Sequence, residues 1–554
     1  MTQPPPPPPP NQPPPPPGYG YPQQPNPYAQ QPNPYAQQPQ QPQPPYGYSY
    51  PQQPQPVHPP QPPAPQKKLN AQAVIIVSAV AAIALIIGGG VWYSSSKDGR
   101  ADDKAGDKNN TAGATAGTGG GEGGEGAGGD KGADKAPANT ASKVLFQVPE
   151  PAVGADENSA TVVGSWLTDT VYAKSGRAEI VGYDPVKGTR LWTVPLPGPV
   201  CEASRHTTAG HQTAIVYEPA MPTKDKPSHG CSQVAAIDLD EGKKLWTRTV
   251  KSGDQVINLD NVTISANTVA VGSTSGGAAF DITGKSLWAP KPGDSCYDAG
   301  YGGGEKLVAV RKCGSYGARQ LAIQTIDPVS GKVLSEYAMA KGIEDASIVS
   351  TNPLVVAADI NRSAGDGSGI SDFFSIDNKS GRLRTKISAP GDKYAAECEG
   401  VSRIEYCTKL AVGNDKLYLP TESHDGTGEY SKTNEIVAFD LATGELDGQR
   451  ADAGDGWTIS PLTMADGNVI AYKRPPYDKG GEVVSIDSGS FAQTTLMRNP
   501  ATKAVREVEF SMQPDFAEII YADGRLYMSQ VYAHKPSSTG GPRYLAIAYG
   551  TGSN

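Results

Sequence analysis

The first 66 residues of the chain lack charge altogether, since they contain no Lys, Arg, Asp or Glu. They consist almost entirely of Pro, Gln, Tyr, Asn and Gly. Such a segment has too little apolar surface to offset the entropy lost when a chain becomes ordered. We therefore expect residues 1–66 to form a disordered tail with polyproline II character, which is also a candidate ligand for an aromatic groove that recognises proline-rich peptides.

Charge is also absent from Ala73–Tyr93, but these twenty-one residues are predominantly apolar. As a helix they would cover about 31 Å, which matches a hydrocarbon core of about 30 Å. A cleaved signal peptide would lie nearer the N-terminus, with a shorter apolar region and a small-residue cleavage site. The pattern therefore predicts one transmembrane helix within residues 67–96.

The basic residues around this span leave its orientation open, because Lys67 and Lys68 precede it while Lys97 and Arg100 follow it. All six cysteines lie after the span, and an even number confined to one side indicates disulfides in an oxidising compartment. We expect a single-pass protein of the cell (plasma) membrane with a cytoplasmic tail. Residues 97–143, rich in Gly, Ala, Asp and Lys, would be a flexible linker to an extracytoplasmic domain.

Several functional signatures are missing from that domain, residues 144–554. It has no phosphate-binding glycine loop after a strand, no GxSxG motif and no zinc-protease motif. Its formal charge is about −10 and it has no basic stripe, so it lacks the electrostatic footprint of a nucleic-acid-binding protein.

What the domain does contain is a repeat. A short apolar strand ends in Asp, a Gly follows about four residues later, and a second strand begins with Leu-Trp. Weaker copies keep the Asp and the Gly, and the terminal copy at Ala546–Ala548 has lost its Asp. The clearest copies are Asp184, Gly188 and Trp192; Asp238, Gly242 and Trp246; and Asp281, Gly284 and Trp288; the weaker ones start at Asp327, Asp377, Asp440 and Asp487.

Each part of this unit has a local role. Asp at the first turn position can accept hydrogen bonds from backbone N–H groups further along, and Gly supplies the positive φ that closes the hairpin. Trp offers a large flat surface to pack against the next unit. Alternating stretches before each unit predict further strands, and strands recurring in units of about 50 residues are typical of a propeller with four-stranded blades.

The pattern Ala-x-Asp-x-x-x-Gly-x-x-x-Trp resembles the repeat of the pyrroloquinoline-quinone (PQQ)-like β-propeller family, over about residues 144–554 and most clearly in the first three units. That family includes quinoprotein dehydrogenases, the outer-membrane assembly lipoprotein and many bacterial envelope proteins. A dehydrogenase of the family would carry an adjacent Cys-Cys pair, calcium ligands beneath the quinone and a catalytic Asp. No two cysteines are adjacent here, and no Asp or Glu matches a catalytic position. We expect a member that is not an enzyme and has no cofactor, with binding of PQQ and calcium as the alternative.

The number of blades follows from the two ends of the domain. Eight units are present, but the last ends at Asn554 without an outer strand. The segment Val144–Pro149 is similar in sequence to the outer strand Arg190–Pro195, so it can complete the final blade. We predict an all-β fold, an eight-bladed β-propeller of four-stranded antiparallel blades in which the N-terminal strand closes the ring and leaves no open sheet edge. A seven-bladed ring is the alternative.

Loop lengths indicate a binding face. If the strands of a blade are A to D from the inside outward, the D-to-A and B-to-C loops share one face and the Asp–Gly turns lie on the other. Long polar B-to-C loops occur in several blades, and insertions on one face of a repeat fold usually mark the binding face. These loops are Met221–Cys231, Asn361–Asp372, Glu422–Asn434, Lys473–Gly481 and Ala533–Arg543. Their candidate partner-binding residues are Arg362, Asp366, His424, Asp425, Arg474, Tyr477, His534 and Lys535.

The six cysteines allow fifteen connectivities. Pairing in sequence order would place one bridge in each of blades two, four and six, and the first two bridges would tie a D-to-A loop to the neighbouring B-to-C region. The pairs in this hypothesis are Cys201–Cys231, Cys296–Cys313 and Cys398–Cys407.

Two groups of residues suggest metal binding only superficially. His206, His211 and His229 match no closed zinc pattern, so we expect them to be solvated loop histidines. The loop that begins at Asp359 starts like a calcium loop. However, Ala364 stands where the loop needs Gly, and Ile370 stands where it needs a bidentate Glu. We therefore expect a polar Asx-type loop and no metal.

The sequence leaves the partner, the pathway and the oligomeric state open, but it favours one kind of function. That function is an envelope module that binds or scaffolds a protein, peptide or glycan partner at its loop face. One alternative is a propeller that acts as a sensor or a dehydrogenase through PQQ or another small cofactor near the central channel. A second is a protein whose tail recruits a cytoplasmic partner while the propeller senses.

Overall fold

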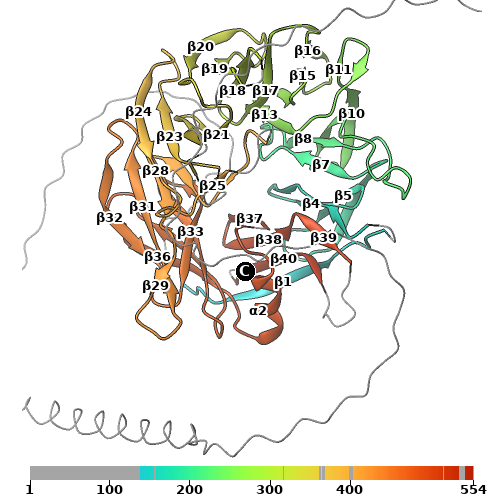
Figure 1. The fold of residues 1–554 in the computed structure, drawn as a ribbon. Helices are drawn as coiled ribbons and strands as arrows, with labels where there is room; N and C mark the ends of the chain where they lie inside the picture. The colour runs from blue at the N-terminus through green and yellow to red at the C-terminus, as the bar shows by residue number, and fades with distance from the viewer. Residues whose placement is uncertain are drawn as a thin grey trace, which may run out of the picture. The chain divides into compact units, whose positions relative to one another are not determined.

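The computed structural model describes residues 138–554, with gaps at 155–156, 316, 361–362, 365–368, 399–402, 516, 536–542 and 553–554. The predicted tail (1–66), the transmembrane segment (67–96) and most of the linker lie outside the described residues. Among the residues described, no helix is long and apolar enough to cross a membrane. The described chain forms a ring of eight four-stranded sheets, which confirms the eight-bladed prediction (Figure 1).

In blades 1 to 4 the strand order from the channel outward follows the chain. All pairings within these blades are antiparallel, and the two middle strands are the most deeply buried. The strands are β3 (Ser165–Leu167), β4 (Tyr172–Gly176), β5 (Glu179–Tyr183) and β6 (Arg190–Pro195); β7 (Val200–Ala203), β8 (Gln212–Tyr217), β9 (Gln233–Asp238) and β10 (Lys243–Thr249); β13 (Asn261–Ser265), β14 (Thr268–Gly272), β15 (Ala278–Asp281) and β16 (Ser286–Trp288); and β17 (Cys296–Gly302), β18 (Leu307–Cys313), β19 (Gln320–Ile326) and β20 (Val333–Ala338).

Blades 5 to 8 repeat the same order, but blades 6 and 8 contain insertions between their second and third strands. The strands are β21 (Ala346–Thr351), β22 (Leu354–Ala358), β23 (Asp372–Ile376) and β24 (Leu383–Ser388); β27 (Ala411–Gly413), β28 (Lys416–Pro420), β31 (Glu435–Asp440) and β32 (Leu446–Asp452); β33 (Thr458–Ala465), β34 (Asn468–Arg474), β35 (Glu482–Ile486) and β36 (Gln493–Arg498); and β37 (Ala517–Ala522), β38 (Arg525–Gln530), β40 (Tyr544–Thr551) and β1 (Ser142–Pro149).

The two ends of the domain meet in blade 8. Strand β1, cyan in Figure 1, lies beside the red β40 and pairs with it antiparallel, with Phe146 opposite Ala548. The predicted closure by the N-terminal strand is therefore confirmed. An ion pair adds to it, since the buried Lys174 Nζ of blade 1 lies 2.7 Å from Oε2 of the partly exposed Glu518 of blade 8.

The turns between the third and fourth strands owe their shape to the conserved spacing of Asp and Gly within the repeat. In blade 1, Asp184 Oδ1 accepts hydrogen bonds from the backbone N–H groups of Lys187 (2.7 Å) and Val186 (2.9 Å). These donors hold the pKa of the Asp184 carboxyl below its usual value. Gly188 follows at φ +66°, where a side chain would be strained.

Neighbouring blades in the first half of the ring are joined by an aromatic side chain on a glycine. Trp192 of blade 1 packs so closely on Gly242 of blade 2 that an added methyl group would overlap the indole. Trp246 lies in the same way on Gly284. The closing strand repeats the contact with Phe146 on Gly188, so Phe146 takes the place of Trp as the similarity of the two segments predicts.

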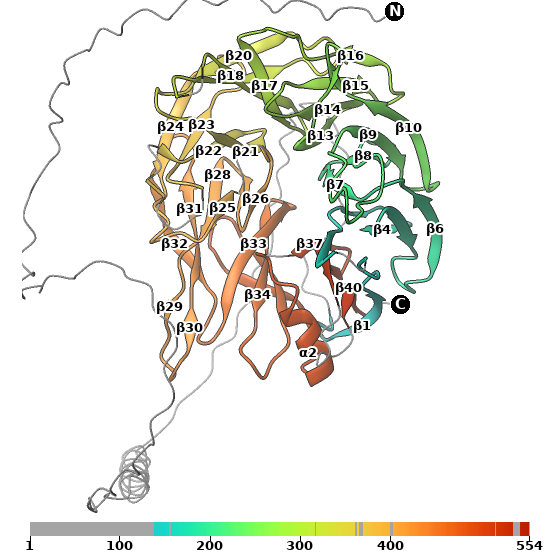
Figure 2. The ribbon, with the colours of Figure 1, turned by 45° about the vertical axis from the view of Figure 1, so that its right-hand side comes forward.

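Four short two-stranded ribbons and one helix lie in connections on one face of the described ring, the loop face. The loop face carries the D-to-A and B-to-C connections, and the turn face carries the A-to-B and C-to-D turns. In Figure 2 the β29–β30 hairpin and the helix α2 project from the orange and red part of the ring. The short helix α2 was not predicted, but it lies in a loop and leaves the all-β architecture of the ring unchanged. The additional elements are β2 (Ser159–Thr161) with β39 (Tyr532–His534), β11 (Lys251–Ser252) with β12 (Gln255–Val256), β25 (Glu397–Cys398) with β26 (Cys407–Thr408), β29 (His424–Asp425) with β30 (Lys432–Thr433), and α2 (Lys503–Phe510).

All three predicted disulfides are present: Cys201–Cys231, Cys296–Cys313 and Cys398–Cys407. Their positions differ in detail from the prediction. Cys201 and Cys296 lie in the innermost strands of blades 2 and 4, not in the preceding D-to-A loops. The third bridge joins β25 to β26 in the long loop that leads from blade 5 into blade 6.

Candidate functional site

The centre of the ring is entered by the chain itself. We define residues 403–408, in the D-to-A loop between blades 5 and 6, as the plug segment. It contacts the inner strands of successive blades: Ile404 O accepts a hydrogen bond from Ile348 N of blade 5, and Ile404 packs against Gly300 of blade 4. Arg403 Nε donates to Glu202 Oε1 of blade 2 at 2.9 Å. Since inner strands line the channel of a propeller, these contacts place the plug segment in the channel.

Glu405 anchors the plug segment toward the turn face. Its carboxylate accepts hydrogen bonds from Thr263 Oγ1 at 2.6 Å and from the backbone N–H of Gly303 at 2.9 Å. His206 Nε2 lies 2.7 Å from Glu405 Oε1. The carboxylate of Glu405 is therefore held by blades 2, 3 and 4 together.

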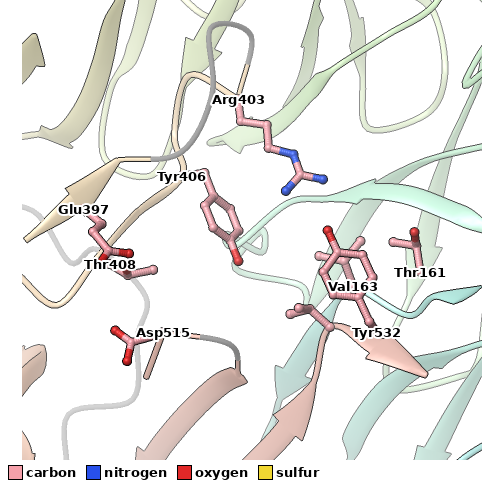
Figure 3. Close-up of a pocket in the computed structure, with 9 residues that line it drawn as sticks. Thr161, Val163, Glu397, Arg403, Tyr406, Thr408, Asp515 and Tyr532 are labelled. Carbon is pink, nitrogen blue, oxygen red and sulfur yellow. The ribbon is translucent and has the colours of Figure 1, made fainter. Parts of the chain in front are cut away.

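A pocket of about 280 Å³ lies beside the plug segment at the mouth of the channel (Figure 3). We call it the channel-mouth pocket. Blades 1 and 8 form one side of it, and the opposite side comes from the plug segment, β25 and the loop before blade 8. Tyr406 and Arg403 point into it from the plug segment (Figure 3). Its lining consists of Thr161, Val163, Glu397, Arg403, Tyr406, Thr408, Asp515, Val531 and Tyr532.

The aromatic ring of Tyr406 contacts two guanidinium groups. Arg205 and Arg403 place their Cζ atoms 5.3 and 5.4 Å from the ring centroid. Arg205 also donates to Cys407 O at 3.0 Å, so it ties the same segment to blade 2. Cation–π contacts of this kind favour a rigid ring orientation, which gives the pocket a preformed aromatic wall.

A lysine neutralises two carboxylates on the same side of the pocket as Tyr406. Lys409 Nζ lies 2.6 Å from Asp515 Oδ1 and 2.8 Å from Glu397 Oε1. Burial alone would lower the pKa of Lys409, but its hydrogen bonds to the two carboxylates outweigh burial and the pKa is raised. Lys409 therefore stays protonated and joins the blade 5–6 loop to the loop before blade 8.

The predicted partner-binding residues fall into separate groups on loops of blades 6, 7 and 8. His424 and Asp425 lie in the β29–β30 hairpin, where Asp425 is 2.6 Å from Lys432 Nζ and His424 Nε2 is 3.2 Å from Glu435. His534 lies in β39, and Lys535 follows it. Arg362 and Asp366 are outside the described residues.

Arg474 and Tyr477 are brought together with the helix α2. Arg474 Cζ stands 4.7 Å from the ring centroid of Phe510, and Arg506 Cζ stands 5.2 Å from that of Tyr477. Tyr477 is 92% exposed. The prediction named Arg474 and Tyr477 but not the helix whose side chains contact them.

Sequence reasoning missed the pocket itself. The B-to-C loops drew attention because they are long and polar, yet the pocket depends chiefly on D-to-A loops. The signal was present in the chain, because the connection from β24 to β27 is unusually long and contains its own cysteine pair. Nothing in the repeat, however, indicates that such a loop enters the channel.

The residues with metal-binding chemistry form other interactions. Among the described residues, one group of potential ligands lies close together, Cys201, Glu218 and Cys231, and its two sulfurs are bonded to each other. His206 pairs with Glu405, and His211 Nδ1 lies 2.8 Å from Asp240 Oδ2. In the loop that resembles a calcium site, Asp359 Oδ1 accepts a hydrogen bond from the backbone N–H of Ala364, 3.0 Å away.

The chain matches a family model over part of its sequence, and alignments with solved structures extend over more of it. Residues 140–294 match the model of a family described as outer membrane protein assembly factor BamB. A search of curated proteins gave no match. Among solved structures, BamB from Moraxella catarrhalis is 12% identical, with a TM-score of 0.37 and coverage of 74% of this chain and 100% of that chain.

Two further structures illustrate the range of the likeness. Quinohemoprotein alcohol dehydrogenase from Comamonas testosteroni is 11% identical, with a TM-score of 0.40 and coverage of 74% of this chain and 76% of that chain. The WD40 repeats of RRP9 are 10% identical, with a TM-score of 0.36 and coverage of 75% of this chain and 98% of that chain. The family match to 140–294, together with the eight four-stranded blades and their repeat, supports a PQQ-like β-propeller.

Proposed function

We propose that this PQQ-like β-propeller is a non-enzymatic binding module of the bacterial cell envelope that takes a protein partner at its channel-mouth pocket. The predicted transmembrane helix would hold it at the membrane, with the propeller outside the cytoplasm. The observation that carries the proposal is the convergence of loops from blades 1, 5, 7 and 8 on one pocket beside the plug segment. Loops from distant parts of a repeat fold meet in this way where a ligand is bound.

The walls of the pocket suit a peptide segment. Val163 and Val531 offer apolar surface, while Tyr406, Tyr532 and Arg403 belong to the residue types that dominate protein interfaces. Two small ribbons border the pocket, β2–β39 and β25–β26, and each is a two-stranded sheet. A strand of such a ribbon pairs on one edge within its sheet, so its other edge can accept an extended segment of a partner.

The charges around the pocket favour recognition over acid–base chemistry. Arg403 is paired with Glu202, and Lys409 is paired with Asp515 and Glu397. A general acid or base needs a pKa near the working pH. The raised pKa of Lys409 moves away from that range.

The cofactor alternative fits these residues poorly. All six cysteines form bridges between positions 30, 17 and 9 residues apart, so no adjacent pair exists. Ile404 and Glu405 occupy the channel region in which a small cofactor would lie. Titrating the full-length protein with PQQ, with and without calcium, checks this. A saturable rise in unfolding temperature with a change in quinone absorbance would favour the alternative.

Site-specific photo-crosslinking in intact cells tests the proposal. A photoreactive residue at Tyr532, on the rim of the pocket, should give a discrete adduct with a protein. The matched control is Val329, which is 70% exposed on the turn face and should give none. Tyr406→Ala should lower the yield at Tyr532. Equal yields at Tyr532 and Val329, or a yield that Tyr406→Ala leaves unchanged, would overturn the proposal; a glycan adduct would replace the protein partner by a glycan.

The same crosslinking experiment distinguishes binding by the propeller from the alternative in which the tail, residues 1–66, recruits a cytoplasmic partner. Deletion of residues 1–66 should leave the adduct at Tyr532 unchanged if the propeller binds its partner directly. A partner that is lost with the tail would favour recruitment on the cytoplasmic side.

A further inference from the structure

Residues of the plug segment make contacts toward both faces of the ring. Arg403 and Tyr406 line the channel-mouth pocket on the loop face. Glu405, between them, reaches the Gly303 turn and His206, which both belong to A-to-B connections on the turn face. Because these residues share a few backbone bonds, a displacement of Glu405 must displace the walls of the pocket.

The contacts of Glu405 differ in kind. Thr263 and Gly303 are neutral donors, whereas His206 can carry a proton and make a charge-assisted hydrogen bond. The side chain of His206 is 34% exposed and that of Glu405 is 15% exposed. His206 can therefore exchange its proton with solvent while Glu405 stays covered.

We propose that His206 and Glu405 form a proton-controlled latch that seats the plug segment and so regulates the channel-mouth pocket. Protonated His206 holds the carboxylate of Glu405, and loss of the proton weakens this hydrogen bond and loosens Arg403 and Tyr406. The regulatory part of this inference rests on the proposed function, in which the pocket is the binding site. The latch itself is a property of the fold.

The direction of the pH dependence follows from the charges around the pair. Burial alone would lower the pKa of His206, but the Glu405 carboxylate outweighs burial and the neighbouring Arg205, so the pKa is raised above 6.5. Burial alone would raise the pKa of Glu405, but His206, Thr263 and Gly303 outweigh it, so the pKa is lowered below 4.5.

The remaining charges near the plug segment form a separate group at the loop face. Arg403 pairs with Glu202 and also lies near Asp260. Burial raises the pKa of Asp260, although the positive charge of Arg403 acts in the other direction. The stabilisation from His206 is complete below pH 6.5 and is lost as the pH rises through the raised pKa. The stabilisation from Glu405 is complete above pH 4.5 and is lost as the pH falls through the lowered pKa. The latch is therefore strongest between these two values and loosens toward alkaline pH.

Hydrogen exchange at the amides of residues 403–408, measured on the full-length protein and corrected for intrinsic exchange, tests the latch without any partner. From pH 6 to pH 8.5 we expect protection to fall roughly fivefold, since a hydrogen bond to a charged group is replaced by a neutral one. In His206→Gln, protection should be low at both pH values. In the matched control His211→Gln, which removes the His211–Asp240 pair outside the plug segment, it should fall as in the wild type.

Two results would overturn the latch: wild-type protection that does not change with pH, or a His206→Gln variant that keeps the wild-type change. Glu405→Gln gives a second test, because it keeps the size of the side chain and should also abolish the change. The yield of the Tyr532 adduct at the two pH values tests the regulation. If exchange responds but the yield does not, the regulation is wrong while the proposed function stands. If no adduct forms at either pH, the proposed function fails and hydrogen exchange still decides the latch.

Discussion

The two halves of the ring are built from the same four-stranded unit but are joined in different ways. From the closing strand to blade 4, each joint is an aromatic ring on a glycine, as in Trp246 on Gly284. At the next two joints the corresponding position holds a small hydroxyl residue. Ser335 Oγ donates to Asn378 O at 2.6 Å, and Thr385 Oγ1 donates to Thr443 O at 3.3 Å.

This difference in joints accompanies a difference in loops. The family match at 140–294 falls in the aromatic half, where the repeat is strongest. The plug segment, the β25–β26 and β29–β30 ribbons and α2 all belong to the other half. We infer that the aromatic half provides a regular scaffold, while the second half has departed from the repeat and acquired the insertions that build the pocket.

We expect the largest effect on stability when a joint between blades is broken, and we compare one such joint from each half of the ring. Trp246→Ala should lower the free energy of unfolding by about 3–5 kcal/mol, because a buried indole and its hydrogen bond to Ile282 O are lost. The matched change Ser335→Ala, which removes one hydrogen bond, should cost only about 1 kcal/mol. Denaturant unfolding of both variants measures this, and equal costs would contradict the division into two halves.

Disulfide removal should separate stability from binding. Replacing Cys201 and Cys231 by Ser opens a 30-residue separation and should cost roughly 3–4 kcal/mol, yet leave the Tyr532 adduct intact. Replacing Cys398 and Cys407 opens a 9-residue separation and should cost only about 2–3 kcal/mol, yet abolish the adduct because Cys407 lies within the plug segment and the bridge ties it to β25. Denaturant unfolding measures the loss of stability in both double variants, and crosslinking measures the yield of the Tyr532 adduct. If only the Cys201/Cys231 variant lost the adduct, the first bridge and not the second would support the binding site.

Alkaline pH should test the joint where the ring closes. Burial raises the pKa of Tyr527 to about 12, against 10.0 for an exposed tyrosine. Between these values the unfolded chain loses its proton first, so stability falls as the pH rises, by roughly 2–3 kcal/mol over the whole range. In Tyr527→Phe this part of the fall should vanish, although the hydrogen bond to Pro185 O is also lost. Unfolding measured at several values above pH 9.5 gives the two slopes, and identical slopes would exclude Tyr527 as a cause.

The smallest expected effect concerns a feature that both halves share. Asp184 in blade 1 and Asp440 in blade 6 each accept two backbone hydrogen bonds in their turns. Asp184→Ala and Asp440→Ala should each cost about 1 kcal/mol at neutral pH. The pKa of both carboxyls is lowered, so this stabilisation is present above pH 3.8 and is lost as the pH falls below it. Unequal costs at neutral pH would show that the turns, as well as the joints, differ between the halves.

Sequence reasoning succeeded where the interactions are local or periodic. The Asp–Gly turns, the eight units and the equivalence of Phe146 with Trp192 could all be predicted, because each depends on a pattern that repeats along the chain. The disulfides followed because each pair lies within one blade or one loop. The helix α2 was missed because its eight residues lie in a single irregular loop without a periodic counterpart.

The sequence by itself favoured eight blades, with seven as the alternative, because eight units can be counted along the chain. It also predicted how the ring closes and on which face each loop lies, because these follow from the incomplete last unit and from the order of strands within a unit. Only the tertiary structure decided that residues 403–408 enter the channel and that Arg403 meets Glu202, 201 residues away in the chain. Such contacts join residues on different sides of the ring, and these residues do not occupy equivalent positions in the repeat. Their partners depend on where the closed ring places the loop, and a local pattern carries no information on that.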